Sequence, residues 1–201
     1  MSSTPAEMWE GRYGGDDFVY GTEPNDFLVE SVADVAPGDV LCLADGEGRN
    51  GVYLASLGHR VTSVDLTRAG MSKAARLADE RGVDLTTVVA DLADFDLGTE
   101  RWDIIVSIFA HTPPDIRRRI HAGIAVALRP GGVLVLEAYT PDQIGRGTGG
   151  PPVPELTMTL EGLREELIDL TFEVGREIVR RVVEGSGHTG DGAVVQVVAR
   201  R

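Results

Sequence analysis

The chain has 201 residues, of which 42% are hydrophobic and 25% charged, and its net charge at pH 7 is −13. This length suits one domain with one sizeable core, and the acidic balance argues against a nucleic-acid binder, which needs a basic surface to offset phosphate charge. No apolar run approaches the roughly 18 residues of a membrane span, and the first 15 residues lack the apolar centre of a signal peptide, so we expect a cytoplasmic protein that does not bind membranes.

The N-terminal 38 residues are rich in aromatic residues and glycine, and they end in a short amphipathic helix expected over roughly 25–35. From there, apolar runs alternate with helical stretches. Strands are predicted at 40–44, 60–66, 84–90, 102–109 and 133–139, and helices at 49–57, 68–81 and 114–128. Continuous Val, Ile and Leu runs between helices are typical of a parallel sheet that is covered on both faces.

The pattern changes after residue 140. A loop rich in glycine and proline covers 141–158, and a helix is predicted at 159–167. Two β-rich stretches follow, 170–183 and 193–199, joined by the loop 185–192. A terminal hairpin of this kind predicts an antiparallel strand that closes the sheet. We therefore divide one domain into an arm (1–38), a cofactor-binding core (39–140) and a substrate and hairpin region (141–201).

A glycine-rich turn joins the first strand to the next helix, where residues 41–51 read LCLADGEGRNG. Gly46, Gly48 and Gly51 have the G-x-G-x-x-G spacing of a cofactor cradle. Asp65 ends the second strand, where a carboxylate can accept hydrogen bonds from both hydroxyls of a ribose. NAD and S-adenosylmethionine both carry such a ribose, and a tight turn beside a surface carboxylate is the purely structural alternative.

Two further features favour S-adenosylmethionine. Asp91 follows the third strand, where it can accept a hydrogen bond from an adenine amino group, and LRPGG (128–132) precedes the fifth strand. A nicotinamide oxidoreductase remains the less favoured reading because no Tyr-x-x-x-Lys pair exists: Lys73 is the only lysine, and Ala69 stands four residues before it.

With these motifs, the chain resembles the class I S-adenosylmethionine-dependent methyltransferases, and more narrowly the small bacterial tellurite-resistance and thiopurine-type enzymes. The resemblance runs from WEGRYGGDDFVYGTEPNDFL to EGSGHTGDGAVVQVVARR. It implies an α/β fold with a Rossmann-like, doubly wound sheet of seven strands, the last antiparallel. It also implies S-adenosylmethionine as cofactor and a small-molecule methyl acceptor, such as the soft nucleophile of a thiol or a chalcogen oxyanion. A non-catalytic protein that binds S-adenosylmethionine stays open as an alternative.

The chain departs from the family's usual D-x-G-x-G-x-G motif at two positions, where it has Cys42 and Ala44. The contact to the methionine ammonium group then falls to Asp45 or to backbone carbonyls near Ala44. The full set of expected cofactor-binding residues is Tyr20, Ala44, Asp45, Gly46, Gly48, Asn50, Asp65, Leu66, Asp91, Leu92, Ser107 and Phe109.

Four histidines and one cysteine show no metal-ligand spacing, so no metal site is expected. His111 follows the fourth strand and His188 precedes the last one, so both fall at the carboxyl edge of the sheet, each as a catalytic base, a substrate contact or a structural side chain. His59 is predicted to be structural at the opposite edge, and His121 to lie on the surface of its helix.

The arm is predicted to be either a lid over the cofactor, with Tyr20, Gly21 and Pro24 facing it, or a segment docked on the surface by its aromatic side chains. The loop containing GRGTGGPP (145–152) would close the other side, since glycine hinges and long loops suit gating. We expect a monomer or a homodimer.

Overall fold

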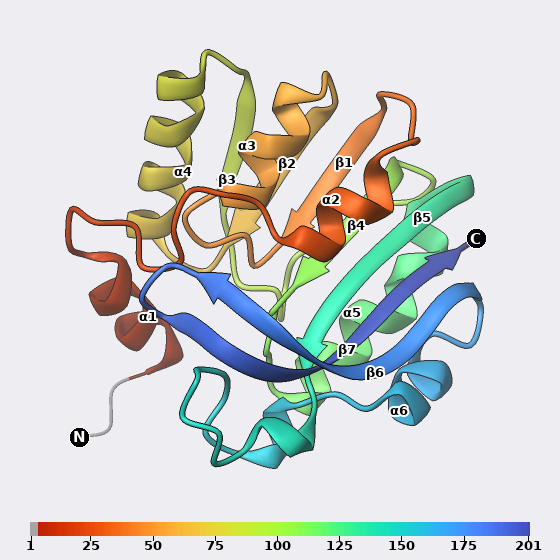
Figure 1. The fold of residues 1–201 in the computed structure, drawn as a ribbon. Coiled ribbons are helices and arrows are strands. Elements are labelled where there is room, and N and C mark those ends of the chain that lie inside the picture. The colour runs from red at the N-terminus through yellow and green to blue at the C-terminus, as the bar shows by residue number, and fades with distance from the viewer. Residues whose placement is uncertain (1–3) are drawn as a thin grey trace.

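The computed structural model describes residues 4–201, and its frame is a seven-stranded sheet in the order β3-β2-β1-β4-β5-β7-β6 (Figure 1). The strands are β1 (Asp39–Leu43), β2 (Arg60–Asp65), β3 (Leu85–Val89), β4 (Trp102–Ile108), β5 (Leu128–Tyr139), β6 (Thr171–Glu184) and β7 (His188–Arg200). The first five run parallel, and β7 pairs antiparallel with both β5 and β6. The prediction of a doubly wound sheet with a reversed last strand is confirmed.

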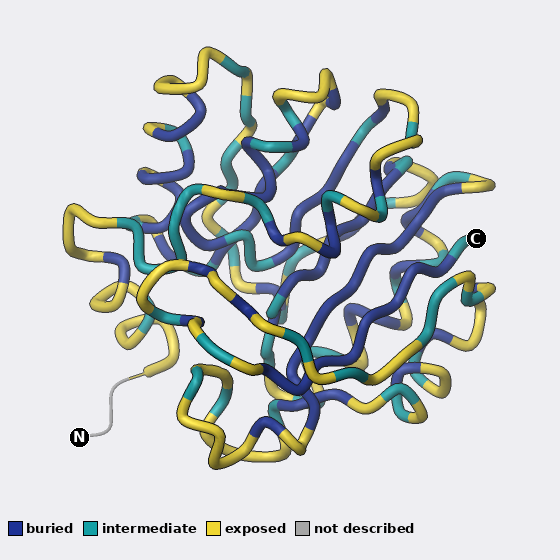
Figure 2. Tube along the Cα trace, in the orientation of Figure 1, coloured by how far each residue is buried: buried dark blue, intermediate teal, exposed yellow. Residues whose placement is uncertain are grey.

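Helices cover both faces of this sheet, and the buried strands lie between them (Figure 2). The helices are α1 (Pro5–Tyr13), α2 (Asp26–Val32), α3 (Arg49–Ser56), α4 (Arg68–Arg81), α5 (Pro114–Ala127) and α6 (Leu160–Glu166). Alternate residues of β1 serve the two faces: Leu41 and Leu43 pack in the cluster that contains residues of α5 and α6, whereas Val40 and Cys42 pack with residues of α2 and α3. Within residues 4–201, none of these helices is both long and apolar enough to cross a membrane.

The arm begins with a helix, α1, that the sequence reading did not predict. Thr4 accepts a hydrogen bond from the backbone N–H of Glu7, the Glu7 side chain accepts one from the backbone N–H of Thr4, and Pro5 opens the first turn. This reciprocal capping box starts the helix even though its sequence is weakly amphipathic.

The ends of several elements also differ from the predicted ones. Strand β5 begins at Leu128, ahead of the Pro-Gly-Gly turn, because Leu128 already pairs with Trp102. In the 141–158 loop, two short 3-10 helices form, η1 (Pro141–Gln143) and η2 (Pro154–Leu156).

The hairpin is tighter than predicted. Glu184 pairs with His188, so only residues 185–187 form the turn and His188 opens β7 instead of lying in a longer loop. Gly185 provides the left-handed backbone that the turn needs, with φ = 59°.

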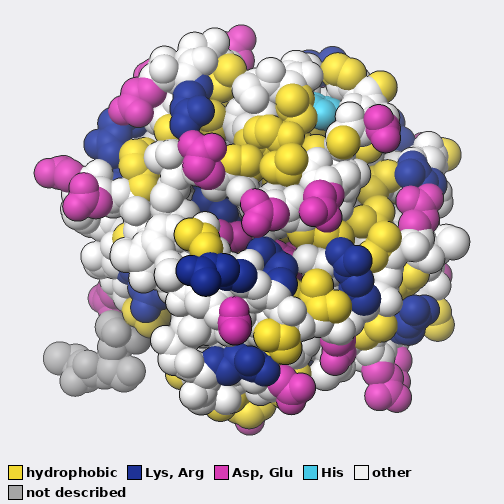
Figure 3. Space-filling view, viewed as in Figure 1, with side chains coloured by type: hydrophobic (Ala, Val, Ile, Leu, Met, Phe, Trp, Pro, Cys, Tyr) yellow, Lys and Arg dark blue, Asp and Glu magenta, His cyan; other side chains and the backbone are white. Residues whose placement is uncertain are grey.

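His121 is buried, so its predicted surface position was wrong. Helix α6 packs on α5 and brings Glu166 Oε2 to 2.6 Å from His121 Nδ1, while Glu166 also accepts hydrogen bonds from Arg117. His59 lies where predicted, before β2, and its Nδ1 accepts a hydrogen bond from the backbone N–H of Gly38. On the face drawn in Figure 3, basic and acidic side chains are interspersed.

Candidate functional site

The glycine turn lies at the carboxyl edge of the sheet, between β1 and α3. Gly46 and Gly48 both have left-handed backbones, with φ of 58° and 88°. A Cβ on Gly48 would lie 2.5 Å from the Cβ of Ala74, so this glycine allows α3 to pack closely on α4. Ala44 also has a positive φ, 49°, which is costly for a residue with a side chain.

Asp65 closes the turn from the neighbouring strand. Its Oδ2 accepts a hydrogen bond from the backbone N–H of Gly46 (3.0 Å), and its Oδ1 accepts two from Thr67, from the backbone N–H (2.9 Å) and the hydroxyl (2.7 Å). Burial raises the pKa of this carboxyl, while the hydrogen bonds from Thr67 and Gly46 oppose the shift. These contacts use three of the roughly four acceptor positions of a carboxylate.

Two cavities meet at this edge, one of about 500 Å³ and one of about 180 Å³. Both are lined by Trp9, Tyr13, Ala44, Phe109 and His111, so they share one wall. Of the predicted site residues, the larger cavity has Tyr20, Ala44, Asp45, Gly46, Asn50, Phe109, His111 and His188. The smaller one adds Asp65, Leu66, Asp91 and Leu92. Gly48 and Ser107 line neither of them; Ser107 is buried in β4.

Asp45 and Cys42 stand in very different surroundings. Cys42 is buried in the core cluster on the α2 and α3 face of β1, and burial raises the pKa of its thiol. Asp45 lines the larger cavity, and its Oδ2 accepts hydrogen bonds from the hydroxyl of Ser63 (2.6 Å) and the backbone N–H of Gly51 (3.2 Å). Burial raises the pKa of Asp45 to about 7 despite these hydrogen bonds.

The arm is fastened to the glycine turn by a buried ion pair that sequence reasoning missed. Glu47, the residue between the two glycines, accepts hydrogen bonds from the backbone N–H groups of Val19 (2.8 Å) and Tyr20 (3.3 Å). The ammonium of Lys73 donates to Glu47 Oε1 (2.8 Å) and to the carbonyl oxygen of Asp17 (2.6 Å). The sequence did contain one signal for this ion pair. Lys73 is the only lysine of the chain, and apart from histidine every other basic residue is an arginine.

Three aromatic side chains that line the larger cavity, Tyr20, Phe109 and His188, pack against one another, and Tyr139 packs on Phe109 and His188 from outside the lining. The imidazole of His188 lies 4.5 Å from the ring of Tyr20 and 4.9 Å from that of Phe109, measured between centroids. Phe109 in turn stacks on Tyr139 at 4.5 Å, and it leaves β4 with a left-handed backbone, φ = 53°. The arm, the segment after β4, strand β5 and the hairpin thus supply one side chain each to this aromatic chamber, which we define as Tyr20, Phe109, Tyr139 and His188.

The two candidate histidines differ in the hydrogen-bond partners of their ring nitrogens. His111 Nδ1 lies 2.8 Å from the carbonyl oxygen of Leu156, to which it must donate, and its Nε2 faces the backbone N–H of Tyr139 at 3.4 Å. Burial lowers the pKa of His111 to about 4, so it is neutral at pH 7. The Nδ1 of His188 has no hydrogen-bond partner among the described residues and lies 3.6 Å from Glu184 Oε2.

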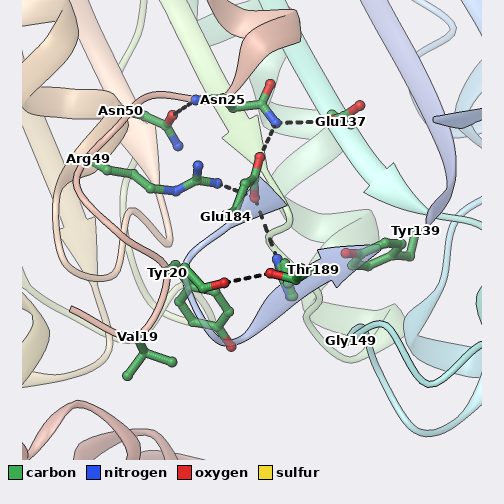
Figure 4. A network of polar contacts seen from close by, with 12 residues as sticks. Val19, Tyr20, Asn25, Arg49, Asn50, Glu137, Tyr139, Gly149, Glu184 and Thr189 are labelled. Atoms are coloured by element: carbon green, nitrogen blue, oxygen red, sulfur yellow. Dashed lines mark hydrogen bonds and ion pairs between the residues drawn. The ribbon is translucent and has the colours of Figure 1, made fainter. Parts of the chain in front are cut away.

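A buried polar network lies behind the chamber (Figure 4). Glu184 accepts hydrogen bonds from Arg49 (2.6 Å) and from the side chain of Asn25 (2.8 Å). The same Asn25 amide donates to Glu137 (2.6 Å), which also pairs with Arg180 (2.6 Å). The network therefore ties the arm and the helix after the glycine turn to strands β5 and β6. Among residues 4–201 there is no cluster of His, Cys, Asp and Glu side chains that could hold a metal ion.

Comparison with known proteins agrees with this arrangement. Residues 40–132, from β1 into β5, match the family model for a methyltransferase domain. This match bears out the methyltransferase part of the resemblance and implies S-adenosylmethionine as the cofactor, whereas the tellurite-resistance and thiopurine subtype stays a prediction. No curated protein sequence matches the chain significantly.

Solved structures share the fold over most of the chain. One comes from work on the conversion of a disulfide bond into a thioacetal group during echinomycin biosynthesis, with 24% identity, a TM-score of 0.79 and coverage of 98% of this chain and 91% of that one. TehB from Haemophilus influenzae has 22% identity and a TM-score of 0.71, and the match covers 97% of this chain and 66% of that one. Burkholderia thailandensis 1,6-didemethyltoxoflavin-N1-methyltransferase, solved with 1,6-didemethyltoxoflavin and S-adenosylhomocysteine, has 25% identity and a TM-score of 0.63, covering 87% and 74%.

Proposed function

We propose that this protein transfers a methyl group from S-adenosylmethionine to the soft nucleophile of a small molecule. The observation that carries the proposal is the pair of adjoining cavities, one lined by Asp65 and Asp91 and the other by the glycine turn and by Tyr20, Phe109 and His188 of the aromatic chamber. The smaller cavity suits the adenosine: the acceptor position that Asp65 has left would take a hydrogen bond from a ribose hydroxyl, and Asp91 would take one from the adenine amino group. The acceptor then belongs in the larger cavity, beside Tyr20 and His188, which do not line the smaller one.

The residues present fit this cofactor. Asp65 keeps acceptor capacity beyond its bonds to Gly46 and Thr67. Asp45, whose pKa burial raises to about 7, would gain a cationic partner in the methionine ammonium group. That partner would favour the ionised carboxylate. Cys42 is buried in the core, so it has no part in this contact.

When bound, the cofactor supplies a methyl group on a sulfonium, and the chain must position the acceptor and exclude water. The fastened arm covers the glycine turn: a Cβ on Gly46 would lie only 2.8 Å from the hydroxyl of Tyr13. Tyr20 is positioned by Arg12, which donates to its hydroxyl at 2.9 Å. We assign the acceptor contact to the chamber walls, Tyr20, Phe109 and His188.

The two histidines take different roles in this proposal. His111 is neutral at pH 7 and both of its nitrogens face backbone groups, so it forms part of the wall. His188 is the base that takes a proton from the acceptor. An imidazole is a suitable base for a thiol, whose ordinary pKa of about 8.5 lies close to neutral pH, and a poor one for an alcohol. A thiol or an already anionic chalcogen oxyanion is therefore the acceptor class that we favour.

Calorimetric titration with S-adenosylmethionine and with NAD tests the cofactor. We expect S-adenosylmethionine to bind and NAD not to bind. NAD binding without S-adenosylmethionine binding would overturn the methyltransferase proposal and favour a nicotinamide-dependent protein.

An acceptor panel of thiols, tellurite, selenite and phenols, followed by release of S-adenosylhomocysteine, tests the reaction. Turnover of a thiol or an oxyanion is the expected result. Tight cofactor binding with no turnover across the panel would instead support a non-catalytic binding protein.

A further inference from the structure

We propose that Glu184 is a positioning residue that sets the tautomer and the basicity of His188; this inference rests on the proposed function, in which His188 accepts the acceptor's proton. Glu184 and His188 face each other as the last pair of the hairpin ladder, with residues 185–187 as the turn between them. Both are buried, with 6% and 8% of their surface exposed. The geometry of the hairpin therefore fixes the carboxylate and the imidazole side by side.

The two nitrogens of His188 have different surroundings. Nδ1 is the buried one, and its nearest acidic atom is Glu184 Oε2 at 3.6 Å, an ion-pair distance longer than a hydrogen bond. Nε2 has no hydrogen-bond partner among the described residues but is not sealed off like Nδ1, and the side chain lines the larger cavity. A carboxylate beside Nδ1 favours the proton on that nitrogen, which leaves the lone pair of Nε2 as the basic site facing the cavity.

Glu184 is held from two directions, so it cannot turn away from His188. Arg49, the first residue of α3, donates to Glu184 Oε2 at 2.6 Å. Asn25, the residue that caps α2, donates to Oε1 at 2.8 Å. Arg49 also follows directly after the glycine turn, so the carboxylate that faces the base is anchored to the cofactor cradle.

The other groups around His188 do not replace this carboxylate. Tyr20 and Tyr139 pack on its imidazole from the arm and from β5, and the neutral His111 lies beyond Tyr139. Arg49 and Arg180 are the nearby cations, and both contact Glu184, at 2.6 Å and 3.7 Å. Glu184 is thus the one acidic side chain in ion-pair contact with His188 within residues 4–201.

The proposed step is a proton transfer. The acceptor's heteroatom gives its proton to Nε2 of His188 and keeps the bonding electron pair, so it becomes the nucleophile. The imidazolium formed carries protons on both nitrogens, and the Glu184 carboxylate balances its charge. The proton then leaves from Nε2 to solvent. No oxidant or reductant is needed.

NMR titration of the imidazole signals in the full chain tests the inference without substrate or cofactor, each signal being assigned by single His→Gln variants. In Glu184→Gln we expect the titration midpoint of His188 to fall by about one pH unit or more, as an opposite charge within 4–6 Å is removed. We also expect the NMR chemical shifts of the His188 ring nitrogens to show that, in the neutral form, a larger fraction of the molecules carries the proton on Nε2.

Glu137→Gln is the matched control, since it disturbs the same buried network without touching His188. It should lower the His188 midpoint much less than Glu184→Gln does, because Glu137 makes no ion pair with His188 whereas Glu184 does. If Glu184→Gln does not fold, Glu184→Asp keeps the charge but withdraws it by one methylene, and should lower the midpoint by a smaller amount.

An unchanged midpoint and tautomer in the variants that fold would overturn the role of Glu184. That outcome is separable from failure of the proposed function, which would appear as absent S-adenosylmethionine binding in the calorimetric titration of the unmodified chain.

Discussion

Lys73 holds the arm to the glycine turn, so its replacement by methionine tests the lid directly. The ammonium bridges Glu47 Oε1 (2.8 Å) and the carbonyl of Asp17 (2.6 Å), and the ion-pair side chains are only 8% and 2% exposed. Removal of one partner of a buried ion pair typically costs about 3–5 kcal/mol, because the other charge stays buried alone. Opening of the arm would expose the Glu47 carboxylate to water and so remove this cost. We therefore expect the arm to open locally before the whole domain unfolds.

Hydrogen exchange measures that opening at the backbone amides of Val19 and Tyr20, which donate to Glu47. A loss of about 3 kcal/mol corresponds to exchange faster by roughly two orders of magnitude. Arg76→Gln is the control from the same helix: Arg76 donates to the carbonyl of Asp16 at 3.0 Å and lies over the ring of Phe18, but it has no buried charge partner in the arm, so its loss should speed exchange much less than Lys73→Met does. Equal exchange in Lys73→Met, Arg76→Gln and the unmodified chain would refute the lid reasoning.

Three further predictions concern the glycine turn. Asp65→Ala should weaken S-adenosylmethionine binding at least about tenfold by calorimetry, since a hydrogen bond to a charged acceptor contributes roughly 1.5–3 kcal/mol; unchanged affinity would remove Asp65 from the site. Gly48→Ala should lower the melting temperature much more than Gly82→Ala. Both glycines have a positive φ, but only at Gly48 would the new Cβ collide with a neighbour, Ala74. Equal losses of melting temperature would contradict the packing argument. The pKa of Asp45 is raised to about 7 by burial, against about 3.9 in an unfolded chain, so its contribution to stability is full below pH 4 and is lost as the pH rises through 7. Asp45→Asn should therefore gain melting temperature relative to the unmodified chain between pH 4 and pH 8, and a pH-independent difference would argue against the shift.

Local sequence patterns were enough to predict the frame of the fold. The Val, Ile and Leu runs of β1, β4 and the second part of β5 are buried on both faces, so their hydrophobicity is continuous and easy to recognise. The helix over Arg68–Arg81 was predicted with its observed bounds because Gly82 ends it in a left-handed conformation. Helix α1 was missed because its apolar face is weak, although Thr4, Pro5 and Glu7 carried a capping signal.

The parts that could not be predicted depend on contacts between distant segments. His121 reads as a surface residue until α6 is packed on α5, which brings Glu166 to it from 45 residues away along the chain. Glu47 and Lys73 are likewise 26 residues apart along the chain and meet only through the fold. The hairpin placed His188 at the carboxyl edge as the topology required, but its pairing with Glu184 depends on a three-residue turn whose length the glycines alone did not fix.

Fluorescence of Trp9 provides the most direct test of the central claim, that the adjoining cavities hold S-adenosylmethionine. Trp9 lines both cavities, so occupation of either should change its emission. We predict a saturable change on titration with S-adenosylhomocysteine that is lost in Trp9→Phe, and no response to NAD. Absence of any response to S-adenosylhomocysteine, or a saturable response to NAD alone, would contradict the account.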